Sequence, residues 1–219
     1  MGTVETVFYL SDDALGLTIT SKTRRNALAR VLRASGQWLE VVPGAEGLTV
    51  QYDPLPLMPD AAQKQLEAAL AAPVIPTQSA SKTWVIPVCY EAKYALDMAY
   101  VSAQTGLAPE EIIARHTRAR HNVDMIGFTP GFAYLEGGAR ELDLPRLETP
   151  HTHLPAGAIG LAGGLCGLYA LPGPGGWPII GRTPMALFDV TREDPFSLEP
   201  GHEVCFEAIS STEFDSWVP

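Results

Sequence analysis

The sequence predicts an α+β protein of two domains, and three observations lead to this prediction. The first half alternates short β-rich runs with segments of helical periodicity. Beyond Asn122 this periodicity ends, and glycines and prolines separate many short apolar runs. Residues 73–82, which contain serine and threonine, form the expected connection between the halves. We therefore expect an α+β domain over residues 1–82 and a β-rich domain over residues 83–219.

The first domain is expected to follow the order β-α-β-β-α-β. Ser21 is the expected N-cap of a helix through residue 34, and Asp60 that of a helix that Pro73 ends. The β-rich runs around these helices are residues 6–10, 38–42, 47–52 and 84–88. This order is that of a ferredoxin-like sandwich, in which two helices cover one face of an antiparallel sheet.

The second domain is expected to open with two helices and to continue in short strands. One helix covers residues 94–105, and the other starts at Pro109, whose fixed φ suits the first helical turn. The short apolar runs that follow are residues 123–128, 158–162, 167–171, 178–180, 186–190 and 203–209. Many short strands joined by glycine and proline turns predict a β-barrel or a β-sandwich.

The charge balance and the cysteines point away from several classes of protein. A formal net charge of −10 does not fit the basic face with which nucleic-acid binders neutralise phosphates. The three cysteines are widely spaced without a CxxC motif, which fits a reducing compartment better than a disulfide framework. Neither a signal peptide nor an apolar run of membrane length is recognisable. We therefore expect a cytoplasmic protein that binds neither nucleic acid nor membrane.

Three clusters of glycine and proline form the candidate binding surface. They cover residues 127–135, 154–164 and 174–184, with Phe128, Phe132, Tyr134 and Trp177 interleaved. Glycine lets backbone approach a ligand closely, and amides in such loops can cradle an anion. The alternative is that glycine and proline only serve the turns of a barrel. No Walker A, GxGxxG or GxSxG motif is present, so a nucleotide would need another kind of site.

Arg182, between Gly181 and Thr183, is the first candidate for chemistry. A guanidinium beside glycine can form a fork onto a carboxylate or phosphate, although a surface salt bridge is the alternative. Glu91, Asp97 and Asp189 are candidates for a general base or a substrate contact, with helix caps and surface residues as alternatives. These four residues define where acid–base chemistry is expected.

The histidines and cysteines give weaker signals. His151 and His153 would share one face of an extended segment and could form half of a metal site, or be two partly exposed histidines. No HExxH motif or matched Cys/His set completes such a site, so no metal site is expected. Cys166 is expected to be a small packing residue rather than a nucleophile.

Several of these segments resemble one known family. The three clusters match it, as do residues 86–90 (Ile-Pro-Val-Cys-Tyr) and 41–44 (Val-Val-Pro-Gly), so the resemblance covers nearly the whole chain. The family is that of the B-type component of prokaryotic ATP-dependent 5-oxoprolinase. It also includes Kip-type inhibitors of a sporulation kinase, proteins called allophanate hydrolase subunit 1, and the carboxyltransferase region of urea carboxylase.

The resemblance implies a small α+β N-terminal domain and a cyclophilin-like β-barrel C-terminal domain. It also implies a hydrolase that acts with two partners, a C-type subunit with a related barrel and an A-type subunit. The implied reaction converts 5-oxoproline, ATP and water into glutamate, ADP and phosphate, with magnesium accompanying ATP and no biotin attached to this chain. Phosphorylation of the lactam oxygen would require anion-cradling amides and a cation. A module that inhibits a sensor histidine kinase and a carboxyltransferase-like role toward a biotin carrier remain as alternatives.

The residues expected to serve this function follow from the clusters and the resemblance together. The catalytic candidates are Arg182, Asp97 and Glu91. Substrate or anion binding is expected from Phe128, Pro130, Gly131, Tyr134, His151, His153, Gly163, Gly164, Trp177, Gly181 and Thr183.

Four positions depart from the family pattern. His151 and His153 stand where relatives usually carry arginine, and Leu165 and Cys166 stand where relatives usually carry glutamine and threonine. Histidine, unlike arginine, is not permanently charged at neutral pH, and leucine cannot form a hydrogen bond. We therefore expect an anion site that is weakened, sensitive to pH or adapted to another substrate.

Overall fold

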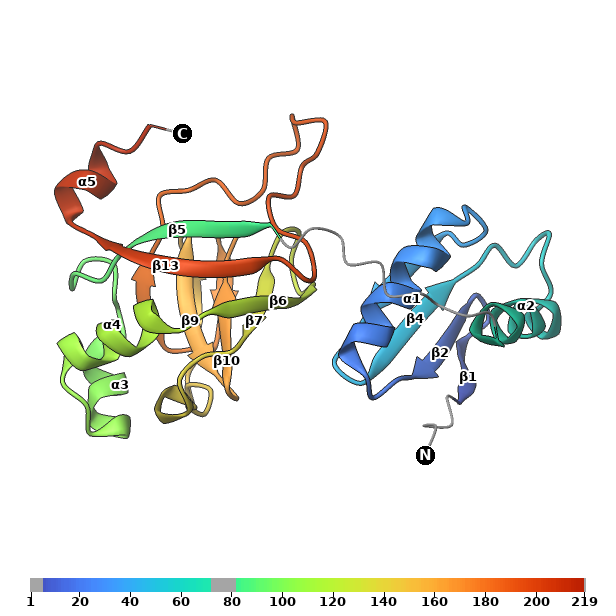
Figure 1. Cartoon of the computed structure of the whole chain (residues 1–219), viewed down its shortest axis with the longest axis horizontal. Helices are drawn as coiled ribbons and strands as arrows, with labels where there is room; N and C mark the ends of the chain where they lie inside the picture. The colour runs from blue at the N-terminus through green and yellow to red at the C-terminus, as the bar shows by residue number, and fades with distance from the viewer. Residues whose placement is uncertain (1–5, 72–81, 219) are drawn as a thin grey trace. The chain divides into compact units, whose positions relative to one another are not determined.

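The computed structural model describes residues 6–71 and 82–218. The chain divides into two compact units, Met1–Ala80 and Ser81–Pro219, each of which has its own core (Figure 1). Among the described helices, none combines the length and apolar character that crossing a bilayer requires.

The first unit is an antiparallel sheet in the order β1-β2-β4-β3 with two helices. Its elements are β1 (Val7–Ser11), β2 (Ala14–Thr18), α1 (Lys22–Ala34), β3 (Glu40–Pro43), β4 (Gly47–Gln51) and α2 (Pro59–Ala71). Ser21 caps α1 as predicted, because its Oγ accepts a hydrogen bond from the Arg24 amide at 3.3 Å. The core residues contributed by β2, α1 and β4 include Leu15, Leu17, Leu28, Leu32 and Val50.

The ferredoxin-like order is not confirmed. The first unit follows β-β-α-β-β-α, and the strand expected at residues 84–88 belongs to the second unit. Strand β2 was missed; it pairs with β1 across the turn Asp12-Asp13. Because this turn contains neither glycine nor proline, the sequence carries no strong signal for dividing the hairpin there.

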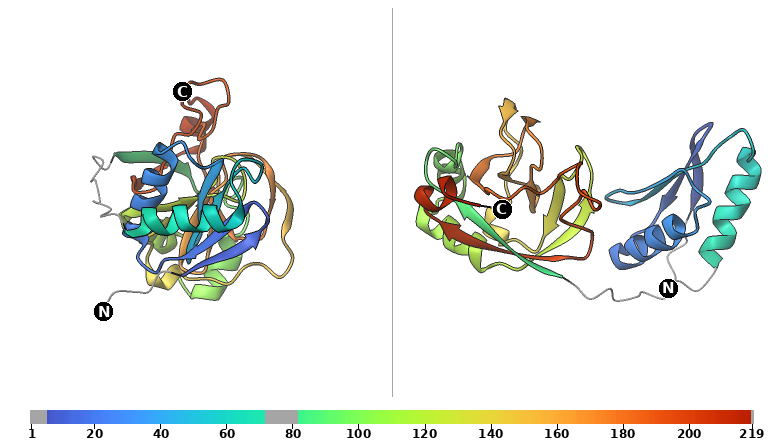
Figure 2. Two further views of the ribbon diagram at one scale, coloured as in Figure 1. Left: turned by 90° about the vertical axis from the view of Figure 1, so that its right-hand side faces the viewer. Right: turned by 90° about the horizontal axis from the view of Figure 1, so that it is seen from above.

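The second unit is built around a closed barrel with the strand order β10-β7-β6-β13-β5-β12-β9 (Figure 1 and Figure 2). The strands are β5 (Thr83–Cys89), β6 (His121–Ile126), β7 (Ala133–Glu136), β9 (Ala158–Ala162), β10 (Leu165–Leu168), β12 (Ile179–Arg182) and β13 (Glu203–Ile209). Strands β5 and β13 pair in parallel along their whole length, whereas the other barrel pairs are antiparallel. The closed barrel confirms the barrel prediction.

The barrel wall separates two hydrophobic clusters. Successive side chains of a strand point to opposite faces, so Ile159 and Leu161 of β9 join the inner core while Ala158 joins the outer cluster. The outer cluster also includes Leu154 from β8 (His151–Leu154), which pairs with β11 (Gly173–Gly175) as a separate two-stranded ribbon. Because both faces are covered, every residue of β9 is buried.

Helices α3 (Met98–Thr105) and α4 (Pro109–Arg118) lie between β5 and β6 in the chain, as predicted. Helix α3 begins later than expected because the amides of Tyr94 and Ala95 instead form a turn onto the Glu91 carbonyl. Figure 1 shows α4 alongside β13, where the two elements are in contact. A short 3-10 helix, η1 (Arg140–Leu142), and a final helix, α5 (Ser211–Asp215), were not predicted.

The strand predictions succeeded where apolar runs are long. Strands β9 and β13 have the predicted bounds, but residues 186–190 contain only an isolated bridge from Phe188 to Phe196. Strands β7, β8 and β11 were missed because each has only three or four residues and mixes polar residues, glycine or proline with apolar ones.

Candidate functional site

One end of the barrel collects Arg182 and several of the loops expected to be functional. Arg182 ends β12 and is paired with Cys89 at the end of β5 and with Ala158 at the start of β9. Strand β13 also ends here, since Ile209 pairs with Cys89. We call this region the Arg182 end. Its loops are residues 90–97, 155–157 and 183–188, together with α5. The loop of residues 127–132 follows β6, which runs antiparallel to β13 from the Asn122–Glu203 pair, so it lies toward the start of β13.

The Arg182 side chain is held at one nitrogen and leaves the others available. Its Nε donates a hydrogen bond to the Ala156 carbonyl at 2.8 Å, and its guanidinium lies over the Phe214 ring of α5 at 5.4 Å from the centroid. Among the described residues, none accepts a hydrogen bond from its Nη1 or Nη2. A guanidinium fixed in this way can present two N–H groups to a carboxylate or phosphate.

The residues beside Arg182 have structural tasks. The Thr183 amide donates to the Gly157 carbonyl at 2.9 Å, and its Oγ1 accepts from the Met185 amide at 3.2 Å. Gly157 has φ +84°, and a Cβ there would meet the Thr183 carbonyl oxygen at 2.2 Å. A Cβ on Gly181 would meet Val88 Cγ1 at 2.7 Å. These glycines therefore allow close backbone packing, and the Thr183 amide is already used within the fold.

The loop that contains Phe128 is strained and exposed. Phe128 has φ +67° and is the sole described residue other than glycine with a positive φ, and its side chain is 63% exposed. This conformation costs a non-glycine residue roughly 1–2 kcal/mol. Gly131 also has a positive φ, and a Cβ there would lie 2.8 Å from Phe188 Cβ, whereas Pro130 is exposed. An exposed aromatic residue held in this conformation is typical of a contact site rather than of a core.

Aromatic rings support this loop from the outer face of the barrel. The Phe132 ring lies 5.5 Å from Phe128, 4.7 Å from Tyr134 and 4.9 Å from Tyr169, each between ring centroids. The Trp177 ring completes the cluster at 6.0 Å from Phe132 and is buried. Burial raises the pKa of Tyr134 and of Tyr169. Tyr134 and Trp177, expected to bind substrate, therefore pack mainly beneath the Phe128 loop.

Asp97 and His151 are in contact, although the sequence indicated them as separate candidates. Asp97 Oδ2 accepts a hydrogen bond from His151 Nε2 at 2.8 Å and another from the Ile179 amide at 2.7 Å. The pair therefore ties the start of α3 to β12 and to the β8–β11 ribbon. Because a carboxylate oxygen accepts, His151 Nε2 carries the proton of this hydrogen bond. His153 is exposed.

The remaining acidic candidates stabilise helix and loop ends. Glu91 Oε1 accepts a hydrogen bond from the Ser211 amide at 2.8 Å, in the first turn of α5. Asp189 accepts from the Thr191 amide and hydroxyl, and these hydrogen bonds lower the pKa of Asp189. Glu91 thus positions α5, whose Phe214 lies under Arg182, and Asp189 organises an exposed turn.

Comparison with known proteins identifies the family. The carboxyltransferase domain family, subdomains C and D, matches residues 6–198. A protein of Bacillus subtilis, named as the B-type component of 5-oxoprolinase, is 33% identical over 190 residues, covering 82% of this chain and 79% of its own. The chain belongs to this 5-oxoprolinase family. A member from Escherichia coli O157:H7 with the same name is 34% identical and covers 87% of both chains.

Solved structures agree with this family assignment. The crystal structure of TTHA0988 has a TM-score of 0.77 and 33% identity, covering 90% of this chain. The match occupies 40% of the TTHA0988 chain, so that protein is considerably longer. The Kluyveromyces lactis urea carboxylase has a TM-score of 0.72 at 16% identity, covering 96% of this chain and 22% of its own, and it shows the shared fold alone.

The second glycine cluster of this 5-oxoprolinase family member extends along β9, and its last two glycines lie at the far end of that strand from Arg182. Gly163 and Gly164, with φ +57° and +71°, form the two-residue turn of the β9–β10 hairpin, and the Gly163 amide donates to the Leu144 carbonyl at 2.8 Å. We call this region the hairpin end. These two glycines form a hairpin turn, which agrees with the alternative interpretation that glycine only serves the turns of a barrel. Anion binding by this pair stays a prediction.

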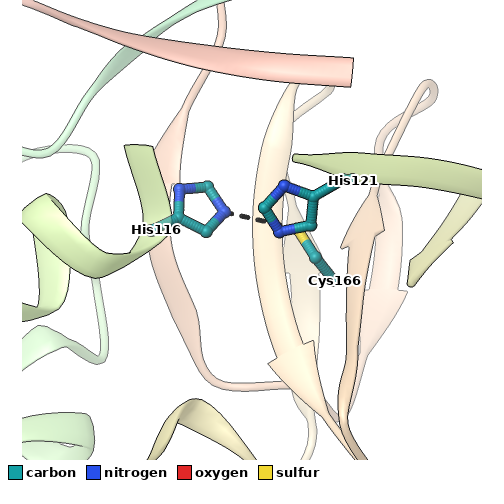
Figure 3. A group of neighbouring side chains, drawn as sticks. All are labelled: His116, His121 and Cys166. Atoms are coloured by element: carbon teal, nitrogen blue, oxygen red, sulfur yellow. Dashed lines mark hydrogen bonds between the residues drawn. The ribbon is translucent and has the colours of Figure 1, made fainter. Parts of the chain in front are cut away.

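The structure also assembles a polar group that our sequence reasoning missed. His116 of α4, His121 of β6 and Cys166 of β10 converge inside the barrel wall (Figure 3). Burial lowers the pKa of His116 well below its ordinary value and that of His121 to about 4, and it raises the pKa of Cys166. The sequence did carry a signal that both histidines face the core. His116 follows buried Ile112 by four residues on a helix, and His121 precedes buried Val123 by two residues on a strand.

Proposed function

We propose that this chain is the B-type component of an ATP-dependent 5-oxoprolinase and that its Arg182 end contributes to an active site completed by other subunits. The main support is the pair of relatives that carry this name, which align over about four fifths or more of both chains. The name of these relatives implies further subunits, and we assign them as a C-type subunit with a related barrel and an A-type subunit.

The proposed reaction balances with two water molecules. The lactam oxygen of 5-oxoproline attacks the γ-phosphorus of magnesium-bound ATP, and ADP leaves. One water attacks the activated carbon, and the ring C–N bond breaks to release the amino group. A second water cleaves the resulting acyl phosphate, which gives glutamate and inorganic phosphate. Phosphorylation makes an unreactive amide carbon electrophilic, and the protein must hold the anions involved.

We assign Arg182 the carboxylate of 5-oxoproline. This assignment uses the two guanidinium NH2 groups, which have no acceptor among the described residues, and Nε fixes their direction through the Ala156 carbonyl. Phe128, in the loop after β6, offers an exposed apolar ring, which suits contact with a partner subunit. Glu91 is a positioning residue because it acts through α5 and Phe214.

The test is turnover by the reconstituted complex. The chain is co-expressed with C- and A-type subunits, and phosphate release that depends on 5-oxoproline is measured. Arg182→Ala should raise KM for 5-oxoproline about 10- to 100-fold, the range expected for loss of a charge-assisted hydrogen bond. Arg182→Lys should recover only part of this loss, since lysine cannot form the fork.

Arg120→Ala is the matched control. Its side chain is exposed and pairs with Glu203 near the hairpin end, so turnover should be unchanged. If the wild-type complex assembles but shows no 5-oxoproline-dependent ATP hydrolysis, the proposed function is wrong. If Arg182→Ala has wild-type kinetics, the carboxylate assignment is wrong.

Two other roles remain predictions: inhibition of a sensor histidine kinase and action toward a biotin carrier. Purification of the tagged chain from its source cells separates the three. Recovery of a kinase or a biotinylated protein in place of C- and A-type subunits would favour one of these roles.

A further inference from the structure

Three side chains that commonly bind metals meet inside the barrel. His116, His121 and Cys166 each offer one ligand atom, and these atoms all lie within 4.8 Å of one another. The three residues come from α4, β6 and β10, and none is more than 1% exposed. Figure 3 shows the two imidazole rings facing each other with the cysteine beside them. The three residues lie outside the loops of the Arg182 end, and the inference does not depend on the proposed function.

His121 lacks a full hydrogen-bond partner among the described residues. Both of its ring nitrogens are buried, and neither has a hydrogen-bond partner among the described residues. The Ala119 backbone acts on the ring as a weak hydrogen-bond partner that raises the pKa of His121 against the effect of burial, but its geometry falls short of a full hydrogen bond. Buried polar atoms are nearly always paired, so an unpaired imidazole that faces another imidazole and a thiol points to a missing ligand.

The spacing of the other two ligands already suits a metal. His116 Nε2 lies 3.5 Å from Cys166 Sγ. A tetrahedral ion with metal–nitrogen bonds of about 2.0 Å and a metal–sulfur bond of about 2.3 Å would place these atoms about 3.5 Å apart. The same distance also suits a weak S–H to nitrogen hydrogen bond, so the decisive feature is the third, unpaired residue. His121 must approach by no more than about 1.5 Å to complete the set.

The surroundings of His116 would fix it as a metal ligand. Tyr90 Oη lies 2.6 Å from His116 Nδ1, on the far side of the ring from Cys166. A metal on Nε2 leaves the proton on Nδ1, which can then donate to Tyr90, and such outer partners are typical of metal-bound histidine. The Phe206 ring stacks on His116 at 4.3 Å and keeps this side apolar.

We propose that His116, His121 and Cys166 bind one soft metal ion, Zn²⁺ or Cu(I). Imidazole and thiolate together favour these ions over Mg²⁺ or Ca²⁺. Cu(I) would be neutralised by a single thiolate and accepts three ligands, whereas Zn²⁺ would need a fourth ligand and retain a positive charge.

The test uses the purified full chain, stripped with a chelator and then titrated. One sample receives Zn²⁺, one receives Co²⁺ as a spectroscopic substitute, and one receives Cu(I) without oxygen. We expect one ion per chain by elemental analysis, a thiolate-to-cobalt charge-transfer band, and a higher melting temperature with the preferred ion. The ion that raises the melting temperature at stoichiometric amounts distinguishes Zn²⁺ from Cu(I).

Variants separate the site from adventitious binding. Cys166→Thr, a change to the family residue, and His121→Gln should each abolish stoichiometric binding and the charge-transfer band. Tyr90→Phe should weaken binding about 10- to 100-fold by removing the outer partner. Cys205→Ser, at a half-buried cysteine of β13, should bind as the wild type does. If Cys166→Thr fails to fold, the result for His121→Gln alone decides. Stoichiometric metal binding by His121→Gln would overturn the proposal, and so would the absence of metal binding by the wild type.

Discussion

The Arg182 end and the hairpin end of the barrel have similar glycine-rich sequences but differ in what their polar groups do. At the hairpin end, the Gly163 amide is bonded to Leu144, and the glycines form a turn. At the Arg182 end, the guanidinium is anchored at Nε alone. In the first glycine cluster, Phe128 is held exposed with a positive φ. Unused donors and backbone strain therefore separate a candidate site from turn chemistry, whereas composition does not.

The largest expected effect is a loss of stability, and it compares a glycine substitution at the Arg182 end of the barrel with one at the hairpin end. Gly157→Ala combines a positive φ with a Cβ 2.2 Å from the Thr183 carbonyl oxygen, so it should lower the free energy of unfolding by at least about 3 kcal/mol. Gly164→Ala has a positive φ, but its nearest atom is 3.9 Å away, and the loss should be about 1–2 kcal/mol. Chemical denaturation of both variants gives the comparison, and equal losses would contradict it.

Acid should act on the hairpin end, where β6 begins with His121. Its pKa falls from 6.5 to about 4 on folding because of burial, so the unfolded chain binds the proton more tightly. The free energy of unfolding is therefore not reduced by His121 above about pH 6.5, and it falls progressively as the pH drops from 6.5 toward 4. By about pH 5 the loss should be about 2 kcal/mol for the metal-free chain.

Denaturation of the chelator-treated chain at about pH 7 and about pH 5 checks this expectation. Carboxylates also titrate near the lower pH, so His121→Gln is the reference. The wild type should lose more stability than this variant between the two pH values. An equal loss would show that His121 does not take up a proton on unfolding in this range.

The smallest expected effect on stability concerns Phe128. Phe128→Gly relieves a strain of about 1–2 kcal/mol and loses a ring contact worth about 0.5–1.5 kcal/mol, so stability should change by less than about 1 kcal/mol. Its affinity for the co-purified C-type subunit should fall. Phe128→Leu keeps an apolar side chain and should retain more affinity. If Phe128→Gly leaves both assembly and turnover unchanged, the Phe128 loop is no contact site.

The sequence predicted those features that depend on local patterns. Ser21 capping, the start of α4 at Pro109, and the bounds of β9 and β13 all follow from residues close in the chain. It did not predict β2, because the Asp12-Asp13 turn contains neither glycine nor proline. The placement of Gly163 and Gly164 at the opposite end of β9 from Arg182 depends on strand register, which no local pattern encodes.

The candidate site was predictable only in part for the same reason. Arg182 was singled out by its glycine neighbours, and the structure does leave part of its guanidinium available. The contact between Asp97 and His151 joins residues 54 positions apart, and that between His116 and Cys166 joins residues 50 positions apart. Such pairs arise from barrel closure, so the individual residues could be named from sequence but not matched.

The parallel pairing of β5 with β13 also sets the order of events during synthesis. Strand β5, the first of the barrel, cannot pair with β13 until β13 has been synthesised, since Thr83 is paired with Glu203 and Cys89 with Ile209. A ribosome must therefore synthesise the chain through residue 209 before the barrel can close, whereas all strands of the first unit lie within residues 7–51. Contacts this distant slow folding. We expect nascent chains to carry a folded first unit ahead of an open barrel, whose unpaired β5 edge is then a target for chaperones.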